Sequence, residues 1–238
     1  MKLKTLIQYQ CWTTLKSICI YFAIMYSIVL IAYILNYVVG DPSHFGFRSV
    51  EFSTCIYLGI SGGLSFSEDF KMALQNGFTR RYAFIATLGM FVFLSIVMGF
   101  IDTMVAWLIC YFVPSYDSLF MMIYGHSYSI FLQWLWLVLM YFMVAMFIYM
   151  IVIIYNRIGK KIFIPISLAL GLILVLIVPM LVTYVFPTSF LYDCLQVISH
   201  LFGITKQGIM LLNPFLFYLV VSACFSLIAY TLVYKSQI

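Results

Sequence analysis

The side chains that could carry out chemistry are few and widely spaced in this chain of 238 residues. His44, His126 and His200 lie far apart, and none has a second histidine four residues further on, the spacing with which one helix holds a metal ion. Neither an HExxH motif nor a phosphate-binding glycine loop followed by lysine occurs. We therefore expect no catalytic residue, no metal site, no bound cofactor and no enzymatic activity in this chain.

One acidic residue, Asp102, lies inside a long apolar run, Tyr82–Val113. An acid within a membrane span is a functional candidate, because burying its charge is costly. Asp102 stands 20 residues after Tyr82, however, which is about 30 Å along a helix. That depth predicts a position near the outer interface, where the carboxyl group is wetted or caps a helix. A role in transport is the alternative.

The composition is that of an integral membrane protein. Hydrophobic residues make up 66% of the chain and charged residues 8%, with a mean hydropathy of +1.13. Soluble domains are about half apolar and about a quarter charged. Because a spanning helix needs about 20 apolar residues, the apolar runs predict an all-α fold with six transmembrane helices in a single domain, 1–238. The predicted spans are Ile18–Val39, Phe52–Phe66, Tyr82–Val113, Ser129–Ile154, Ile162–Phe186 and Phe215–Val233.

The distribution of basic residues predicts the orientation, because lysine and arginine gather in cytoplasmic loops. Ten of the twelve lie in the N-terminal segment, the second and fourth connectors and the C-terminal tail, whereas Arg48 and Lys206 lie on the other side. Both termini are therefore expected in the cytoplasm. The net charge of +5 follows from this topology, and no basic run with interleaved aromatic residues suggests nucleic-acid binding.

The six cysteines are scattered, and no two have CxxC spacing. Cysteine packs as a small hydrophobic residue, so we expect free thiols and neither disulfides nor a metal site. The cysteines are Cys11, Cys19, Cys55, Cys110, Cys194 and Cys224.

Two segments outside the spans have helical patterns. Residues 1–17 carry an apolar arc interrupted by Lys4 and Lys16, which predicts an amphipathic helix lying on the cytoplasmic leaflet. The alternative is that the first span simply begins early. The connector 187–214 is the longest outer segment, and apolar residues recur at helical spacing within Leu191–Ile204. We expect a short helix there, on or in the outer leaflet.

The second span is rich in small residues, with Gly59 and Gly63 four positions apart on one face. Small residues at this spacing let two helix backbones approach closely. We expect both glycines to pack against a neighbouring helix. A role in lining a substrate path is the alternative.

The most polar segment is the connector Ser67–Tyr82, which carries five charges between two apolar spans. Ser67 is a preferred N-cap residue and Gly77 a preferred C′ residue, so together they predict a short helix that stops at the Asn76-Gly77 pair. Thr79 is expected to cap the span that follows.

The same connector has an apolar and a basic part. Phe70 and Leu74 are expected to form an exposed apolar patch, and Arg80 and Arg81 to anchor the segment at the lipid surface. The simpler alternative is a solvated loop with interfacial anchors. That alternative explains the two arginines but not a capped helix with exposed apolar side chains.

The run Glu68-Asp69-Phe70 … Leu74-Gln75-Asn76-Gly77-Phe78-Thr79-Arg80-Arg81 resembles the first intracellular loop of type-2 ABC exporter permeases, most of all the small permeases of low-GC Gram-positive bacteria. There, an acidic start, an NG-x-[ST]-R turn and an aromatic residue follow in this order. Six spans, both ends inside, an interfacial N-terminal helix and a helical outer loop extend the similarity over essentially the whole chain. The resemblance implies a multi-pass protein of a bacterial cell membrane.

In such permeases this loop is a coupling helix that docks in a groove of a separate ATP-binding-cassette subunit. The resemblance implies polar contacts from the acidic pair, apolar side chains that fill the groove, and two arginines, Arg80 and Arg81, that hold the loop at the membrane. The connector Asn156–Lys161 would be a lesser second contact. The residues implied in the main contact with the ATPase subunit are Glu68, Asp69, Phe70, Leu74, Asn76 and Gly77.

The resemblance therefore implies an exporter subunit that works as a homodimer or with a related permease chain. It would move a hydrophobic or amphipathic substrate, with ATP hydrolysed by the partner ATPase. The large outer substrate-binding domains of some family members are missing here. The alternative is a non-transporting immunity or regulatory membrane protein that binds a partner through its outer loops, for which changes in Leu191–Ile204 would matter and charge changes in the cytoplasmic connector would not.

Overall fold

The computed structural model describes most of the chain. Three residues considered above for the orientation or a metal site, namely His44, Arg48 and Lys206, lie outside the described residues, as does much of the second half of the predicted fifth span. The described residues are 2–39, 49–112, 116–173, 175, 179–180, 188–205 and 208–235.

The described residues form a mainly helical fold, as the composition predicts. Four of their helices are long and apolar enough to cross a membrane. They are α1 (Lys2–Val39), α4 (Arg80–Phe112), α6 (Ile130–Ile158) and α10 (Leu212–Lys235). They correspond to the predicted first, third, fourth and sixth spans. Helices suit this environment because a helix satisfies its own backbone hydrogen bonds where no water is available.

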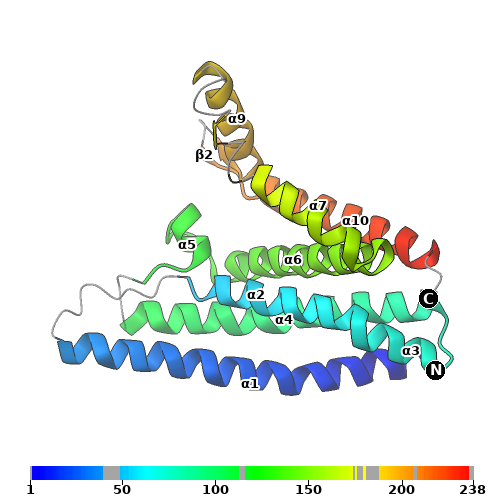
Figure 1. Cartoon of the computed structure of the whole chain (residues 1–238). Coiled ribbons are helices and arrows are strands. Elements are labelled where there is room, and N and C mark those ends of the chain that lie inside the picture. The colour runs from blue at the N-terminus through cyan, green and yellow to red at the C-terminus, as the bar shows by residue number, and fades with distance from the viewer. Residues whose placement is uncertain are drawn as a thin grey trace.

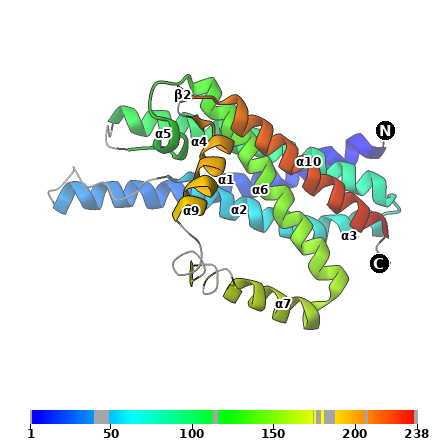
Figure 2. The ribbon, with the colours of Figure 1, turned by 90° about the horizontal axis from the view of Figure 1, so that it is seen from above.

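Helix α6 is the centre of the bundle. It packs against α4, α10 and α2 (Glu51–Leu64), and α1 packs on the far side of α4 (Figures 1 and 2). Its buried side chains include large aromatic residues along most of its length. Helix α6 thus has protein on several sides, whereas α1 and α10 leave long apolar faces exposed for lipid.

The segment predicted as the second span and the connector after it form one continuous helical rod, whose first helix, α2, is not among the four long enough to cross a membrane. Helix α2 passes without a break into the π-helical segment η1 (Ser65–Phe70) and then into α3 (Lys71–Gln75). The prediction that a new helix starts at Ser67 is wrong. The Ser67 hydroxyl donates to the carbonyls of Gly63 and Leu64 one turn back, instead of capping a helix start.

The N-terminal segment does not form a separate interfacial helix, so that prediction is also wrong. Residues 2–39 are one helix of 38 residues, and the alternative of an early start to the first span is what the structure has. Near its start, Leu6 is buried in the core, and Ile7 packs against Gly89 of α4. These contacts pack the first turns of α1 against α4, in line with the rest of the helix.

Shorter elements complete the chain. Helix α5 (Leu119–Tyr124) packs against α6, whereas α7 (Lys160–Leu172) has no buried residue and diverges from the bundle beyond its junction with α6 (Figure 2). The connector 187–214 contains α9 (Thr188–Leu201), which confirms the helix predicted there, whereas its position on the outer side remains a prediction. It is followed by a small antiparallel pair of strands, β1 (Ile204–Thr205) and β2 (Gly208–Ile209).

Four chain segments meet at one end of the bundle. The start of α1, the turn after α3, the α6–α7 junction and the end of α10 all lie there (Figures 1 and 2). This arrangement is the one that the distribution of basic residues requires if those segments face the same compartment. The compartment itself remains a prediction.

The closest approach between α2 and α6 is made by Gly62. A Cβ atom on Gly62 would lie 2.9 Å from the backbone oxygen of Ala145, whereas the nearest atoms to a Cβ on Gly59 and Gly63 are side-chain carbons at 3.4 and 3.6 Å. Small residues thus do mediate helix packing, as expected of this span. Gly59 and Gly63 contact α6 only loosely, and the tight position between them is Gly62.

This difference predicts opposite results for two neighbouring substitutions. Gly62→Ala forces the backbones of α2 and α6 apart and should destabilise the protein by about 1–3 kcal/mol, the usual cost of overpacking. Gly63→Ala has room for its methyl group and should be neutral or slightly stabilising, because alanine favours a helix over glycine by about 1 kcal/mol. Thermal unfolding of both variants in detergent tests this. Equal destabilisation by the two would contradict it.

Candidate functional site

The turn after α3 has a well-defined helix-ending geometry. Gly77 has a φ of +77°, its N–H donates to the carbonyl of Leu74 at 3.0 Å, and the N–H of Phe78 donates to the carbonyl of Ala73 at 3.1 Å. This pair of bonds is the Schellman motif, in which a residue with positive φ at C′ closes the helix. The prediction that Gly77 ends the helix is confirmed.

The next helix begins immediately after this motif. Thr79 accepts a hydrogen bond at its side-chain oxygen from the N–H of Tyr82 at 3.4 Å, so the predicted cap is confirmed. The side chain of Asn76 donates to the carbonyl of Met72 at 2.8 Å. The turn therefore connects two helices with little freedom to change its shape.

The apolar side of α3 faces the chain's own core, and the prediction of an exposed Phe70 is wrong. Phe70 and Ala73 have no exposed surface, and the Phe70 ring stacks on Phe66 with centroids 5.2 Å apart. Leu74 is half-buried against the same cluster. Because no new helix starts at Ser67, the helical face that is buried in the span stays buried through Phe70.

The polar side of the same rod is exposed. Its exposed residues continue into the turn and form what we call the polar face: Glu68, Lys71, Gln75, Asn76 and Gly77. The first three lie three and four positions apart, so they share one side of the helix. Any partner that docks at this end of the bundle meets these side chains and not Phe70.

The arginine pair ties the turn to the C-terminal helix. The Arg80 guanidinium donates to the backbone carbonyl of Tyr234 at 3.4 Å, and the Arg81 guanidinium lies 5.6 Å from the centre of the Tyr234 ring. These contacts link the start of α4 to the end of α10. They are compatible with the predicted anchoring at a membrane surface.

Asp69 stands at the boundary between the polar face and the core, and it is half-buried. Burial, and then the charge of neighbouring Glu68, raise the pKa of the Asp69 carboxyl group above its ordinary value, while a hydrogen bond with Ser65 opposes the rise. Among the residues that the structure describes, neither Asp69 nor Glu68 forms an ion pair. Glu68 and Asp69 are thus an adjacent acidic pair that forms no ion pair within the described residues.

A second cluster of polar groups lies inside the bundle, toward the end opposite the termini. Asp102 is only 4% exposed, so the prediction of a wetted carboxyl group is wrong. Its two oxygens accept hydrogen bonds from Tyr141 of α6 at 2.6 Å and Tyr26 of α1 at 3.3 Å. Thr54 of α2 is a third partner, and its hydroxyl also contacts that of Tyr21 at 3.1 Å.

Glu51, at the first position of α2, extends this cluster and was not singled out by the sequence. It is 1% exposed, and its Oε1 accepts a hydrogen bond from the N–H of Leu119 at 3.3 Å. Its position at the start of a span was the available signal, but the same position suits a solvated acid.

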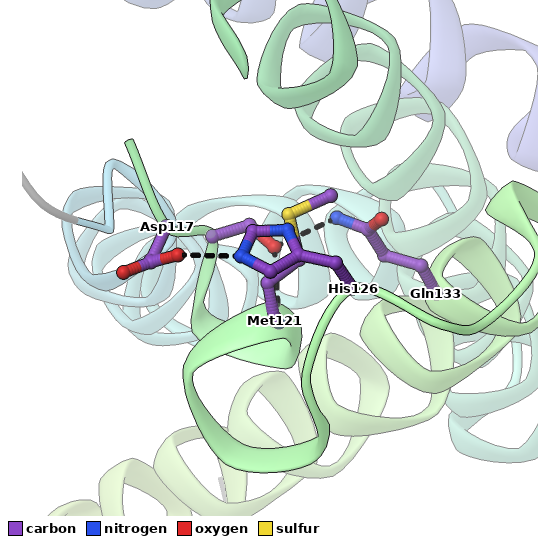
Figure 3. Close-up of polar contacts among 5 residues, drawn as sticks. Asp117, Met121, His126 and Gln133 are labelled. Atoms are coloured by element: carbon purple, nitrogen blue, oxygen red, sulfur yellow. Dashed lines mark hydrogen bonds and ion pairs between the residues drawn. The ribbon is translucent and has the colours of Figure 1, made fainter. Parts of the chain in front are cut away.

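The segment before α5 is fixed by side-chain hydrogen bonds. Ser118 caps α5 by accepting from the N–H of Met121 at 3.2 Å, and the Gln133 side chain of α6 donates to the Ser118 hydroxyl at 2.9 Å. Beside this cap, His126 and Asp117 form an ion pair of 3.1 Å (Figure 3). The N–H of Leu119 that reaches Glu51 is held in place by this cap.

The described residues form neither a hydrolase nucleophile motif nor a metal-binding cluster. The letters of Gly59-Ile60-Ser61-Gly62-Gly63 match the GxSxG pattern of a hydrolase nucleophile, but that motif requires a strand–turn–helix context and here lies in the middle of α2. Within the described residues, no three metal-binding side chains come together. All six cysteines are free thiols, as predicted.

Comparisons with protein-family models, with curated proteins and with solved structures found no match to this chain. The fold and the apolar helices define a class, that of α-helical proteins with helices able to span a membrane. A proposal of function therefore has to rest on the geometry of the polar face and its turn.

The hydrogen-bond lengths around Asp102 predict unequal effects of two matched substitutions. Tyr141→Phe removes the 2.6 Å bond and should destabilise the protein by about 1–3 kcal/mol, because a buried charged acceptor loses a donor. Tyr26→Phe removes the 3.3 Å bond and should cost about 1 kcal/mol or less. Thermal unfolding in detergent measures both. A larger loss of stability for Tyr26→Phe than for Tyr141→Phe would contradict the prediction that the Tyr141 hydrogen bond to Asp102 is the stronger one.

The raised pKa of Asp69 predicts a pH-dependent effect of Asp69→Asn. The folded state penalises the ionised carboxyl, so the stability of the wild type falls as the pH rises through the raised pKa. The asparagine variant carries no such penalty and should unfold at a higher temperature near neutral pH. Its advantage should vanish as the pH falls below the ordinary aspartate range. Identical melting at every pH would contradict the predicted shift.

Proposed function

We propose that this chain is the permease subunit of an ATP-binding-cassette exporter and that the polar face with its turn docks on a separate ATPase subunit. The observation that carries the proposal is a rigid polar turn at the end of the bundle where both termini lie, joined without a break to the second span. A push on such a turn moves a transmembrane segment.

The stiffness of the turn supports this role. The Schellman motif at Gly77, the Thr79 cap and the two arginine contacts to Tyr234 fix the turn to α3, α4 and α10 together. Coupling by a lever requires that the lever not bend at its contact point. A flexible solvated loop would dissipate the motion of its partner.

The acidic pair supports a cationic partner surface. Glu68 and Asp69 are adjacent like charges, and burial already raises the pKa of Asp69. An arginine or lysine from a docked subunit would relieve that repulsion and form a charge-assisted hydrogen bond. The contact we propose is therefore polar, and its residues are Glu68, Asp69, Lys71, Gln75, Asn76 and Gly77. Phe70 and Leu74 pack in the chain's own core and hold the helix in place.

The expected setting follows from the proposed class. The chain lies in a membrane with both termini on the cytoplasmic side, and it pairs with a second copy or a related permease so that two ATPase subunits have two docking turns. Its long exposed apolar faces suit contact with lipid and with a hydrophobic or amphipathic substrate. ATP hydrolysis belongs to the partner.

One observation favours a second candidate, a membrane protein that binds a partner through its outer loops. Helix α9 exposes several large apolar side chains, among them Phe190, Leu195, Val197 and Ile198. A protein of this kind needs no ATPase, and its function would depend on α9 and not on the polar face.

The two candidates are separated by co-purification from the native host. The chain is tagged, solubilised gently and analysed for bound proteins, with the wild type compared to a double variant, Glu68→Lys with Gln75→Lys. The permease proposal predicts that an ATP-binding-cassette subunit co-purifies with the wild type. The amount that co-purifies with the double variant should be lower by about tenfold or more, because a hydrogen bond to a charged group contributes about 1.5–3 kcal/mol.

Two control variants make the result specific. Gln8→Glu changes an exposed residue of α1 at the same end of the bundle and should retain the ATPase subunit. Leu195→Ala changes α9 and should retain it as well. Absence of any ATPase subunit, or its full retention by the double variant, would overturn the permease proposal. A partner lost only by Leu195→Ala would favour the second candidate.

A further inference from the structure

Two buried carboxyl groups lie near each other in the part of the bundle away from the termini. Asp102 of α4 is 4% exposed and Glu51 of α2 is 1% exposed. The groups around them come from α1, α2, α6 and the segment before α5. Neither carboxyl group belongs to the polar face, so this cluster has no part in the docking proposed above.

The partners of Asp102 are all neutral donors. The hydroxyls of Tyr26, Tyr141 and Thr54 hydrogen-bond to its carboxyl group. Such bonds orient a carboxylate, but they leave its negative charge uncompensated inside the protein. Buried charges are normally paired with an opposite charge or coordinate a metal ion.

Glu51 adds an unsatisfied atom. Its Oε1 accepts the N–H of Leu119, whereas its Oε2 is buried and has no hydrogen-bond partner. Val50, next to Glu51, and Ala106, one turn after Asp102, belong to one cluster of buried side chains, so the two acids lie in the same region of the bundle, where their charges interact. A second negative charge therefore adds repulsion to the burial cost of the first, and its free oxygen is available to a ligand.

The described groups that surround the two carboxyls bring no positive charge. Tyr21 and Tyr26 face them from α1, Cys55 from α2, Tyr141 from α6, and Tyr116 from the segment before α5. The nearby His126 is engaged with Asp117 instead. Among the described residues, no lysine, arginine or histidine forms an ion pair with Glu51 or Asp102.

We propose that Glu51 and Asp102 form a binding site for one small monovalent cation, either a sodium ion or a proton. The ligand supplies one positive charge, which removes the repulsion between the two carboxylates and leaves a single net negative charge, and it occupies the free Oε2 of Glu51. Oxygen atoms from carboxylates and hydroxyls are suitable ligands for a hard cation. This site is independent of the ATPase contact and would exist in a protein of either proposed function.

Occupation of the site has a structural consequence. The cation joins α2 to α4, and through the tyrosine hydroxyls it also holds α1 and α6. Without it, repulsion between Glu51 and Asp102 favours separation of these helices at that end of the bundle. Binding should therefore stabilise the helix packing described here by mass action.

The test measures thermal unfolding of the purified full chain in detergent. Unfolding is followed in sodium chloride and in choline chloride of equal ionic strength, at a series of pH values, for wild type, Glu51→Gln and Asp102→Asn. Glu68→Gln, an exposed acid on the polar face, is the matched control. If sodium is the ligand, the wild type and the control gain a saturable rise in melting temperature of several degrees in sodium over choline.

If a proton is the ligand, sodium and choline give the same melting temperature, and that temperature falls as the pH rises even in an Asp69→Asn background, which lacks the pH dependence assigned to Asp69. In both cases Glu51→Gln and Asp102→Asn lose the dependence, and Glu68→Gln keeps it. Binding of radioactive sodium to the wild type, about one ion per chain, separates the two cases without heating.

Two results would overturn the proposal. One is a chain carrying only Asp69→Asn, outside the proposed site, whose melting responds neither to sodium nor to pH. The other is a folded Glu51→Gln or Asp102→Asn, verified by circular dichroism and a single elution peak, that keeps the full wild-type dependence.

Discussion

The close approach of α2 and α6 at Gly62 is the contact on which the rest of the structure depends. The backbone oxygen of Ala145 lies where a side chain on Gly62 would begin. Tyr141 and Tyr149 stand one turn to either side of Ala145, and both are fully buried. Tyr141 reaches Asp102, and Tyr149 packs against rings below the polar turn. One stripe of α6 therefore positions both the buried cluster and the core beneath the polar face.

The rod formed by α2, η1 and α3 connects these two places mechanically. It begins with Glu51 in the buried cluster and ends at Asn76 in the turn, roughly 37 Å away at 1.5 Å per residue. Its π-helical segment, Ser65–Phe70, lies just before the exposed part. π-Helical turns inside α-helices are frequent at functional sites. In the proposed permease, force applied at the turn is thus delivered to a helix that also carries one of the two buried acids.

The sequence predicted features that depend on local chemistry, and it failed where burial decides. Gly77 and Thr79 were identifiable because a positive φ and a helix cap each select a residue type. Ser67 was misread, because a serine that bonds the carbonyl one turn back looks the same in sequence as a serine that caps a helix. Because a new helix was predicted to start at Ser67, Phe70 was wrongly predicted to be exposed. Gly62 and Glu51 could not be singled out, because the face each turns to its neighbours depends on how the helices pack.

The central claim, that the polar face binds an ATPase subunit, is tested most directly by crosslinking in the intact membrane. A photoreactive amino acid is placed at Gln75, on the polar face, and in separate variants at Gln8 and Leu195, and the crosslinked proteins are identified by mass spectrometry. The permease proposal predicts an ATP-binding-cassette subunit crosslinked from Gln75 and not from Leu195. A crosslink to a non-ATPase partner from Leu195, with none from Gln75, would contradict it.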